Sequence, residues 1–133
     1  MNSEHQNPVD TVQHYSEVLL ARAAPILEQA ALAAREQGLQ AQVHTEGSPP
    51  ELCLEVSRDK RGFSSHYRIQ FDSPTGQVHH QLFFASDGSR RTLPGAVESI
   101  NNMVLDTQLS ELFREGFNLN LPALEERHPK GFW

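Results

Sequence analysis

The chain has 133 residues, of which 38% are hydrophobic and 21% are charged, and its formal net charge is −6 at pH 7. This length suits a single domain with its own core, and the composition excludes a globally disordered chain. The acidic balance argues against binding of nucleic acid over the whole surface, although a local basic patch could overcome it.

Cys53 is the only cysteine, so no internal disulfide can form, and no Cys/His spacing resembles a zinc framework. The N-terminus shows no basic region followed by an apolar core, and no stretch approaches about 18 apolar residues. The sequence therefore predicts neither secretion nor a membrane span. We expect a cytoplasmic protein with no metal and no cofactor.

The first element in chain order is a helix. Asn7 and Pro8 have the pattern of an N-cap followed by proline at the first helical position. Apolar residues then recur at steps of three and four as far as Gly38, a residue that commonly ends helices. Because Pro25 lacks an N–H and collides with the preceding turn, we expect the helix to kink or split near residues 21–24.

From Gln40 onward the apolar period changes to two residues, which is typical of β-strands. Turn residues, such as those of the Ser73–Gly76 segment, separate the alternating runs. Links this short favour antiparallel neighbours, so the pattern predicts a four-stranded meander. The four expected strands centre on residues 41–45, 52–56, 67–71 and 78–84.

After Gly88 the period becomes helical again. We expect Pro94 to open a second helix and Gly116 to end it. The segment 117–121 alternates once more and could add a short fifth strand.

The predicted fold class is α+β. It consists of a kinked N-terminal helix, a four-stranded antiparallel meander and a C-terminal helix (α-β-β-β-β-α), with the helices on one sheet face. We assign residues 1–8 to a flexible N-terminus, 9–116 to the single α+β domain, and 117–133 to an extended C-terminal tail that could dock on it.

His79 and His80 are the most site-like pair in the sequence. Adjacent residues on a strand project to opposite faces, so one metal ion cannot take both imidazoles. If Asp72 faces Gln77 across the hairpin, His80 falls opposite Ile69 on the apolar face. We therefore interpret His80 as a hydrogen-bonded residue of the core and His79 as a residue of the polar face.

Cys53 and His66 fall on the polar face of neighbouring strands. A tight loop between their strands would set them opposite one another as a thiol–imidazole pair, whereas other registers separate them. No orienting acid can be placed beside them, so the inert thiol is the preferred interpretation. We assign no catalytic residue and no metal ligand.

Basic residues concentrate in two of the loops. The loops after the second and the fourth predicted strand should emerge at the same end of the sheet, where the second helix is also expected to begin. Phosphate, an acidic peptide or a nucleic-acid backbone could bind there, although basic loop tips also serve solubility. The candidate anion-binding residues are Arg58, Lys60, Arg61, Arg90 and Arg91.

The polar face of the sheet is a second candidate surface, because a phenylalanine lies among its polar residues. The candidate partner-binding residues are His66, Arg68, Gln70, His79, Gln81 and Phe83.

Three functions remain open from the sequence. The first is a non-catalytic protein-binding module or adaptor, with a protein partner or a homodimer on the polar sheet face or the basic end. The second is a nucleic-acid or phosphoanion binder at the basic hairpin tips. The third is a small ligand-binding protein or enzyme with a cavity between sheet and helices. The first is preferred because recognisable catalytic groups are missing.

Overall fold

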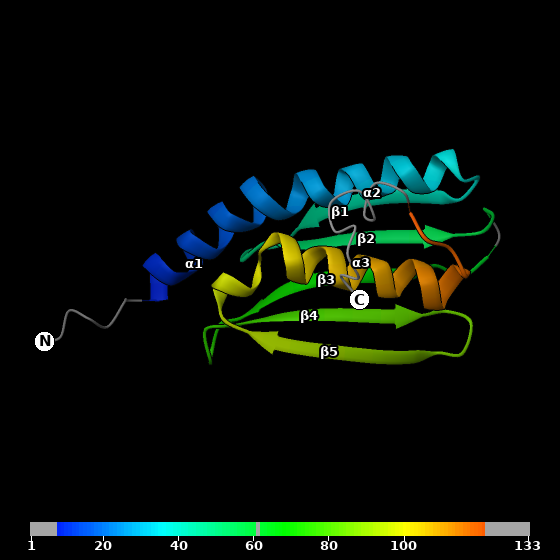
Figure 1. The fold of residues 1–133 in the computed structure, drawn as a ribbon. Helices are drawn as coiled ribbons and strands as arrows, with labels where there is room; N and C mark the ends of the chain where they lie inside the picture. The colour runs from blue at the N-terminus through cyan, green and yellow to red at the C-terminus, as the bar shows by residue number, and fades with distance from the viewer. Residues whose placement is uncertain (1–7, 61, 122–133) are drawn as a thin grey trace, which may run out of the picture.

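The computed structural model describes residues 8–60 and 62–121, and shows an α+β fold with a five-stranded antiparallel sheet of strand order β1-β2-β3-β4-β5 (Figure 1). The α+β class and the antiparallel meander are confirmed, but the expected number of four strands is wrong. The helical segments are α1 (Pro8–Val18), a π-helical turn (Leu19–Ala23), α2 (Ala24–Glu36), a 3-10 turn (Val97–Ser99) and α3 (Asn102–Phe117). The strands are β1 (Gln40–Glu46), β2 (Glu51–Ser57), β3 (Ser65–Asp72), β4 (Gln77–Phe84) and β5 (Ser89–Gly95).

The interruption expected in the first helix takes the form of a π turn at Leu19–Ala23, which ends two residues before Pro25. In this turn the N–H of Ala24 donates to the carbonyl of Leu19, five residues earlier. The wider turn accommodates the proline, which can neither donate to the preceding turn nor fit a regular α-helical one. The helix therefore continues into α2 over the sheet.

The fifth strand is β5, in the segment where the sequence predicts the start of the second helix. Pro94 lies in β5 opposite His79, and it is tolerated because β5 is an edge strand. The helix α3 begins only after Asn101, whose side chain caps it by accepting the N–H of Val104 at 2.9 Å. The prediction that the second helix begins at Pro94 is therefore wrong.

The segment 117–121 does not form the strand that its alternation suggests. Phe117 is the last residue of α3, and Asn118 caps the helix in the left-handed region with φ 53°. Leu121 beyond the cap is buried at the end of the described residues. The expected flexible N-terminus falls on residues 1–8 and the expected tail on residues 117–133, so most of both segments lies outside the described residues.

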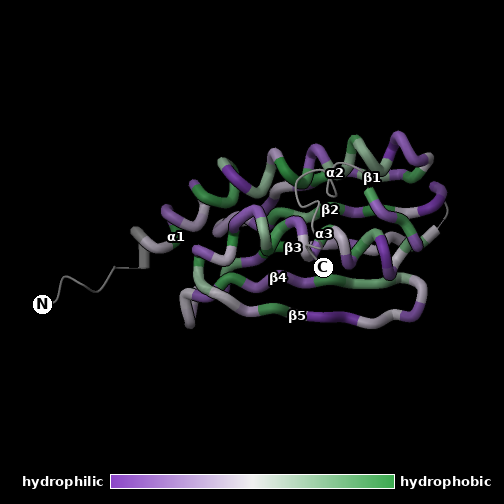
Figure 2. The backbone as a smooth tube through the Cα atoms, in the orientation of Figure 1, coloured by the Kyte–Doolittle hydropathy of each residue, from purple (hydrophilic) through white to green (hydrophobic). Residues whose placement is uncertain are grey.

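The core fills the space between the sheet and the helices. Helix α2 packs on β1 and β2, and α3 packs on β3 and β4, so both helices cover the same face of the sheet (Figure 1). Hydrophobic and hydrophilic residues alternate along the strands, as Figure 2 shows. Large buried side chains in this layer include Tyr15, Tyr67, Phe113, Leu54, Ile69 and Leu82.

The register between β3 and β4 is the one that the sequence predicts. Asp72 pairs with Gln77, Ile69 with His80, and Tyr67 with Leu82. This register places Tyr67, Ile69, Val78 and Leu82 together on the helix-covered face. The divergence of His79 and His80 to opposite faces follows from it.

Candidate functional site

His80 belongs to the core. Its Nδ1 lies 2.6 Å from the hydroxyl of Tyr67, and its Nε2 lies 2.8 Å from Oγ of Ser99. Because Ser99 Oγ donates to the carbonyl of Ala96 at 2.6 Å, it must accept from Nε2–H of His80, and Nδ1 then accepts from Tyr67. Burial, and secondarily the nearby His79, lower the pKa of His80 to about 4. His80 is therefore a neutral structural residue, as expected.

The opposite side of the sheet carries no helix in the described part of the chain, and we call it the open face. Cross-strand pairing arranges its side chains in three rows that run across all five strands. The first row is Gln42, Glu55, His66, Phe83 and Arg90; the second is His44, Cys53, Arg68, Gln81 and Thr92; the third is Glu46, Glu51, Gln70, His79 and Pro94.

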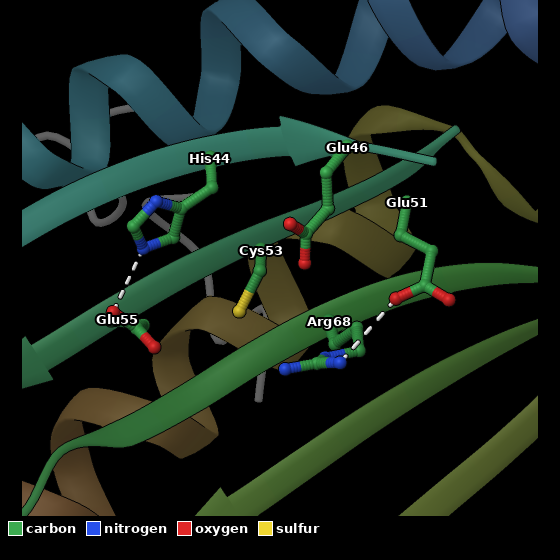
Figure 3. A pocket seen from close by; sticks show the side chains of 6 residues that line it. All are labelled: His44, Glu46, Glu51, Cys53, Glu55 and Arg68. Carbon is green, nitrogen blue, oxygen red and sulfur yellow. Dashed lines mark hydrogen bonds and ion pairs between the residues drawn. The ribbon is translucent and has the colours of Figure 1, made fainter. Parts of the chain in front are cut away.

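The β1–β2 half of the open face is acidic. A shallow depression of about 230 Å³ lies there, lined by His44, Glu46, Glu51, Cys53, Glu55 and Arg68 (Figure 3). His44 Nε2 lies 2.8 Å from Oε1 of Glu55, and this hydrogen bond is the main cause that lowers the pKa of Glu55. Glu51 accepts from Arg68 Nη1 at 3.3 Å and from Gln70 Nε2 at 3.0 Å. Cross-strand contacts thus hold the carboxylates of Glu51 and Glu55 in place.

The β4–β5 half of the open face is aromatic and cationic. The ring of His66 stacks on Phe83 with centroids 5.3 Å apart, and Cζ of Arg90 lies 4.7 Å from the centroid of Phe83. The pKa of His66 is lowered first by burial and then by the charges of Arg68 and Arg90. Phe83 therefore lies between the imidazole of His66 on β3 and the guanidinium of Arg90 on β5.

Cys53 does not pair with His66. Its cross-strand neighbours are His44 and Arg68, whereas His66 stands opposite Glu55. Burial is the largest cause that raises the pKa of the Cys53 thiol to about 11, so the thiol stays protonated at neutral pH. A protonated, buried thiol is a poor nucleophile, in agreement with the preferred interpretation of an inert cysteine.

The four described candidates for anion binding, Arg58, Lys60, Arg90 and Arg91, lie at the same end of the sheet but have different neighbours. Arg58 donates to the carbonyl of Phe117 at 3.1 Å, and Arg91 pairs with Glu111 at 2.9 Å and with Glu115. Arg90, next to Arg91 on the strand, projects to the open face instead. Lys60 lines a separate depression beside Glu55, and Arg61 lies outside the described residues.

The second helix does not begin at this basic end, which corrects the sequence-based expectation. The added strand β5 reverses the chain once more, so α3 starts at the opposite end of the sheet and finishes beside Arg58 (Figure 1). A helix C-terminus attracts cations rather than anions. Arg58 is thus placed to interact with the helix end.

The six predicted partner-binding residues do share the open face. Sequence reasoning did not include His44, Glu51 or Arg90 in this surface. The two-residue alternation of β1 would have indicated His44, and the tight turn at Asp87–Gly88 would have paired Arg90 with Phe83.

Among the described residues, no group of three or more histidine, cysteine or acidic side chains is arranged so that it could hold a metal ion. Likewise, within residues 8–60 and 62–121, every helix is too short or too polar to cross a membrane.

Comparison with known proteins gives no family. The sequence matches no family model, and no similar curated protein and no similar solved structure was found. The open face itself therefore carries the functional argument.

Proposed function

We propose that this chain is a non-catalytic protein-binding module that docks its partner on the open face. The observation that carries the proposal is Phe83, which lies among polar groups between His66 and Arg90 on a sheet face without a helical cover in the described residues. Aromatic and arginine side chains are the groups most enriched at the centres of protein interfaces.

The state of the reactive side chains supports a non-catalytic role. His80 has both ring nitrogens engaged and a pKa lowered to about 4, so it is a weak base in the core. The thiol of Cys53, with its pKa raised to about 11, is not activated. The expected cytoplasmic location remains part of the proposal.

Anion binding at the basic end is less well supported. Arg91 is already paired with two carboxylates and Arg58 with a helix carbonyl, so their charges are partly engaged within the chain. An incoming phosphate would have to displace these contacts.

The proposal is tested with two matched serine variants of the full chain. Phe83→Ser removes the phenylalanine of the open face, whereas Leu32→Ser changes an exposed leucine of α2 on the other side of the molecule. Proteins retained by the immobilised wild-type chain are identified, purified and titrated against all three forms. We expect Phe83→Ser to weaken binding at least tenfold, about 1.4 kcal/mol, and Leu32→Ser to leave it unchanged.

Circular dichroism first establishes that both variants are folded. Loss of binding in Leu32→Ser with retention in Phe83→Ser would place the docking surface on the helices and contradict the proposal. The same conclusion follows if neither another protein nor a second copy of the chain binds at all.

A further inference from the structure

We infer that the open face binds a second copy of this chain, in a symmetric dimer whose two-fold axis runs parallel to the strands above β3. This inference rests on the proposed function, because it names the partner of the same surface. Charge is distributed unevenly over the three rows of the open face.

The two halves of the open face are complementary to each other. The β1–β2 half carries the carboxylates of Glu46, Glu51 and Glu55. The β4–β5 half carries the guanidinium of Arg90 over Phe83 and the imidazole of His79. A surface that contains both signs on separate sides can pair with itself if the symmetry brings unlike halves together.

If the strands of the two copies are aligned, face-to-face pairing allows two orientations of the two-fold axis in the plane between the sheets. An axis across the strands would lay each strand over its own copy and exchange the first row with the third. Glu55 on β2 would then face Glu51 of the second copy, and Glu51 would face Glu55. Two such contacts between like charges oppose this orientation.

An axis along the strands gives the opposite result. Each row then faces the same row of the second copy, and β2 lies over β4 of the second copy. Glu55 then faces the Phe83–Arg90 pair of the second copy, and Glu51 faces its His79. Cζ of Arg90 lies 4.7 Å from the centroid of Phe83 on the adjacent strand, so its guanidinium is within reach of Glu55 of the second copy, which would lie above Phe83.

Arg68 lies on β3 and so comes close to its own copy at the axis. Its Nη1 contacts Glu51 within the same chain at 3.3 Å, so a carboxylate balances each of the two guanidinium charges. This arrangement lets the two central arginines approach without an isolated like-charge contact.

The area of the face sets the expected strength. Five strands spaced about 4.8 Å apart and about seven residues long cover roughly 550 Å² on each copy, or about 1,100 Å² in total. That area is just above the lower limit of about 1,000 Å² for a specific interface. With few apolar groups at its centre, the dimer should dissociate in the micromolar range and weaken as salt screens the charges.

The test is a charge-reversal experiment on the full chain by sedimentation velocity, from about 1 to about 200 µM protein. We expect the wild type to dimerise in about 50 mM salt and to dissociate more readily in about 500 mM salt. Arg90→Glu alone and Glu55→Arg alone should each raise the dissociation constant at least tenfold, because each creates two like-charge contacts per dimer. Arg22→Glu, on the π turn away from the open face, is the matched control and should dimerise as the wild type does.

Mixing the two single variants is the decisive measurement. In a dimer of Arg90→Glu with Glu55→Arg, both charge contacts are again between opposite charges, so association should return. This rescue requires both variants to be folded and requires the two positions to meet across the axis. A mixture that stays monomeric, or a wild-type dimer that neither substitution weakens, would overturn the inference.

A wild-type chain that stays monomeric at about 200 µM would also overturn it. The proposed function has a separate outcome in that case. If another protein then binds the wild type but not Phe83→Ser, the open face is a docking surface for a different partner and only the self-association is wrong.

Discussion

The two faces of the sheet treat polar side chains in different ways. On the helix-covered face, His80 is fully buried, and hydrogen bonds to Tyr67 and Ser99 engage both its ring nitrogens. On the open face, one residue away, His79 is half-exposed and lies beside the half-exposed Gln70. Alternation along a single strand therefore creates one face where every polar group needs an internal partner and another where water or a binding partner can supply it.

This difference separates stability from binding. Removal of apolar surface from water takes place almost entirely between the sheet and the helices, so substitutions there should destabilise the fold. The open face contributes cross-strand pairs of modest energy, and its residues can vary in support of recognition. Substitutions of neighbouring residues on one strand offer a direct way to test the contrast.

The largest expected effect comes from adjacent residues of β4. Leu82 is buried under the helices and Gln81 is on the open face. We expect Leu82→Ala to lower the free energy of unfolding by about 2–5 kcal/mol through lost burial and a residual cavity. Gln81→Ala should change it by no more than about 0.5 kcal/mol. Urea unfolding followed by circular dichroism measures both; similar losses would mean that the open face is part of the core.

A second test uses the pH dependence of stability. Burial lowers the pKa of His80 in the folded chain to about 4, below the ordinary value of 6.5. The unfolded chain therefore takes up a proton first, so the contribution of neutral His80 is complete above pH 6.5 and is lost as the pH falls towards 4. This shift corresponds to about 3 kcal/mol over that interval.

The measurement is urea unfolding of the wild type and of His80→Gln between these pH values. The variant should lose much less stability on acidification, although part of the dependence will remain, because the pKa of His66 is also lowered by burial. His79→Gln, which removes the adjacent imidazole from the open face, serves as the control. Equal pH dependence in the wild type and His80→Gln would contradict the assignment of His80 to the core.

The smallest expected effect concerns the adjacent arginines of β5. Arg91 pairs with Glu111 and Glu115 of α3, whereas Arg90 lies over Phe83 on the open face. Because the Arg91 side chain is 47% exposed, its ion pairs should contribute at most about 1 kcal/mol, and less in high salt. Arg91→Ala should therefore lose a small, salt-sensitive amount of stability and retain self-association. Arg90→Ala should retain its stability and self-associate more weakly. Loss of self-association in Arg91→Ala would contradict the assignment of Arg90 to the open face and of Arg91 to the helix-covered side.

The faces themselves could be predicted from the sequence because burial imposes a two-residue period on a strand. The pairing of Ile69 with His80 and of Tyr67 with Leu82 follows from the apolar pattern and the short turn at Ser73–Gly76. The interpretation of His79 and His80 as divergent needed no further information. The shared polar face of His66, Arg68 and Phe83 follows in the same way.

The positions of β5 and α3 depended on the tertiary structure. The strand β5 begins with Ser89, Arg90 and Arg91, and it lies at the edge of the sheet, where no apolar period is required. Its backbone pairs with β4, an interaction that its own side chains do not reveal. Because of this extra strand, α3 begins at the other end of the sheet. The alternation of β5 also places Arg90 and Arg91 on opposite faces of the sheet.

By itself, then, the sequence determined which residues of β2, β3 and β4 enter the core, because the hydrophobic effect acts on each side chain according to its own polarity. Only the tertiary structure decided which groups the charged side chains contact. Arg91 of β5 pairs with Glu115 of α3, and Arg90 of β5 contacts Phe83 of β4. Both contacts join different elements of the fold. Such contacts depend on the register and topology of the whole sheet, which local periodicity does not encode.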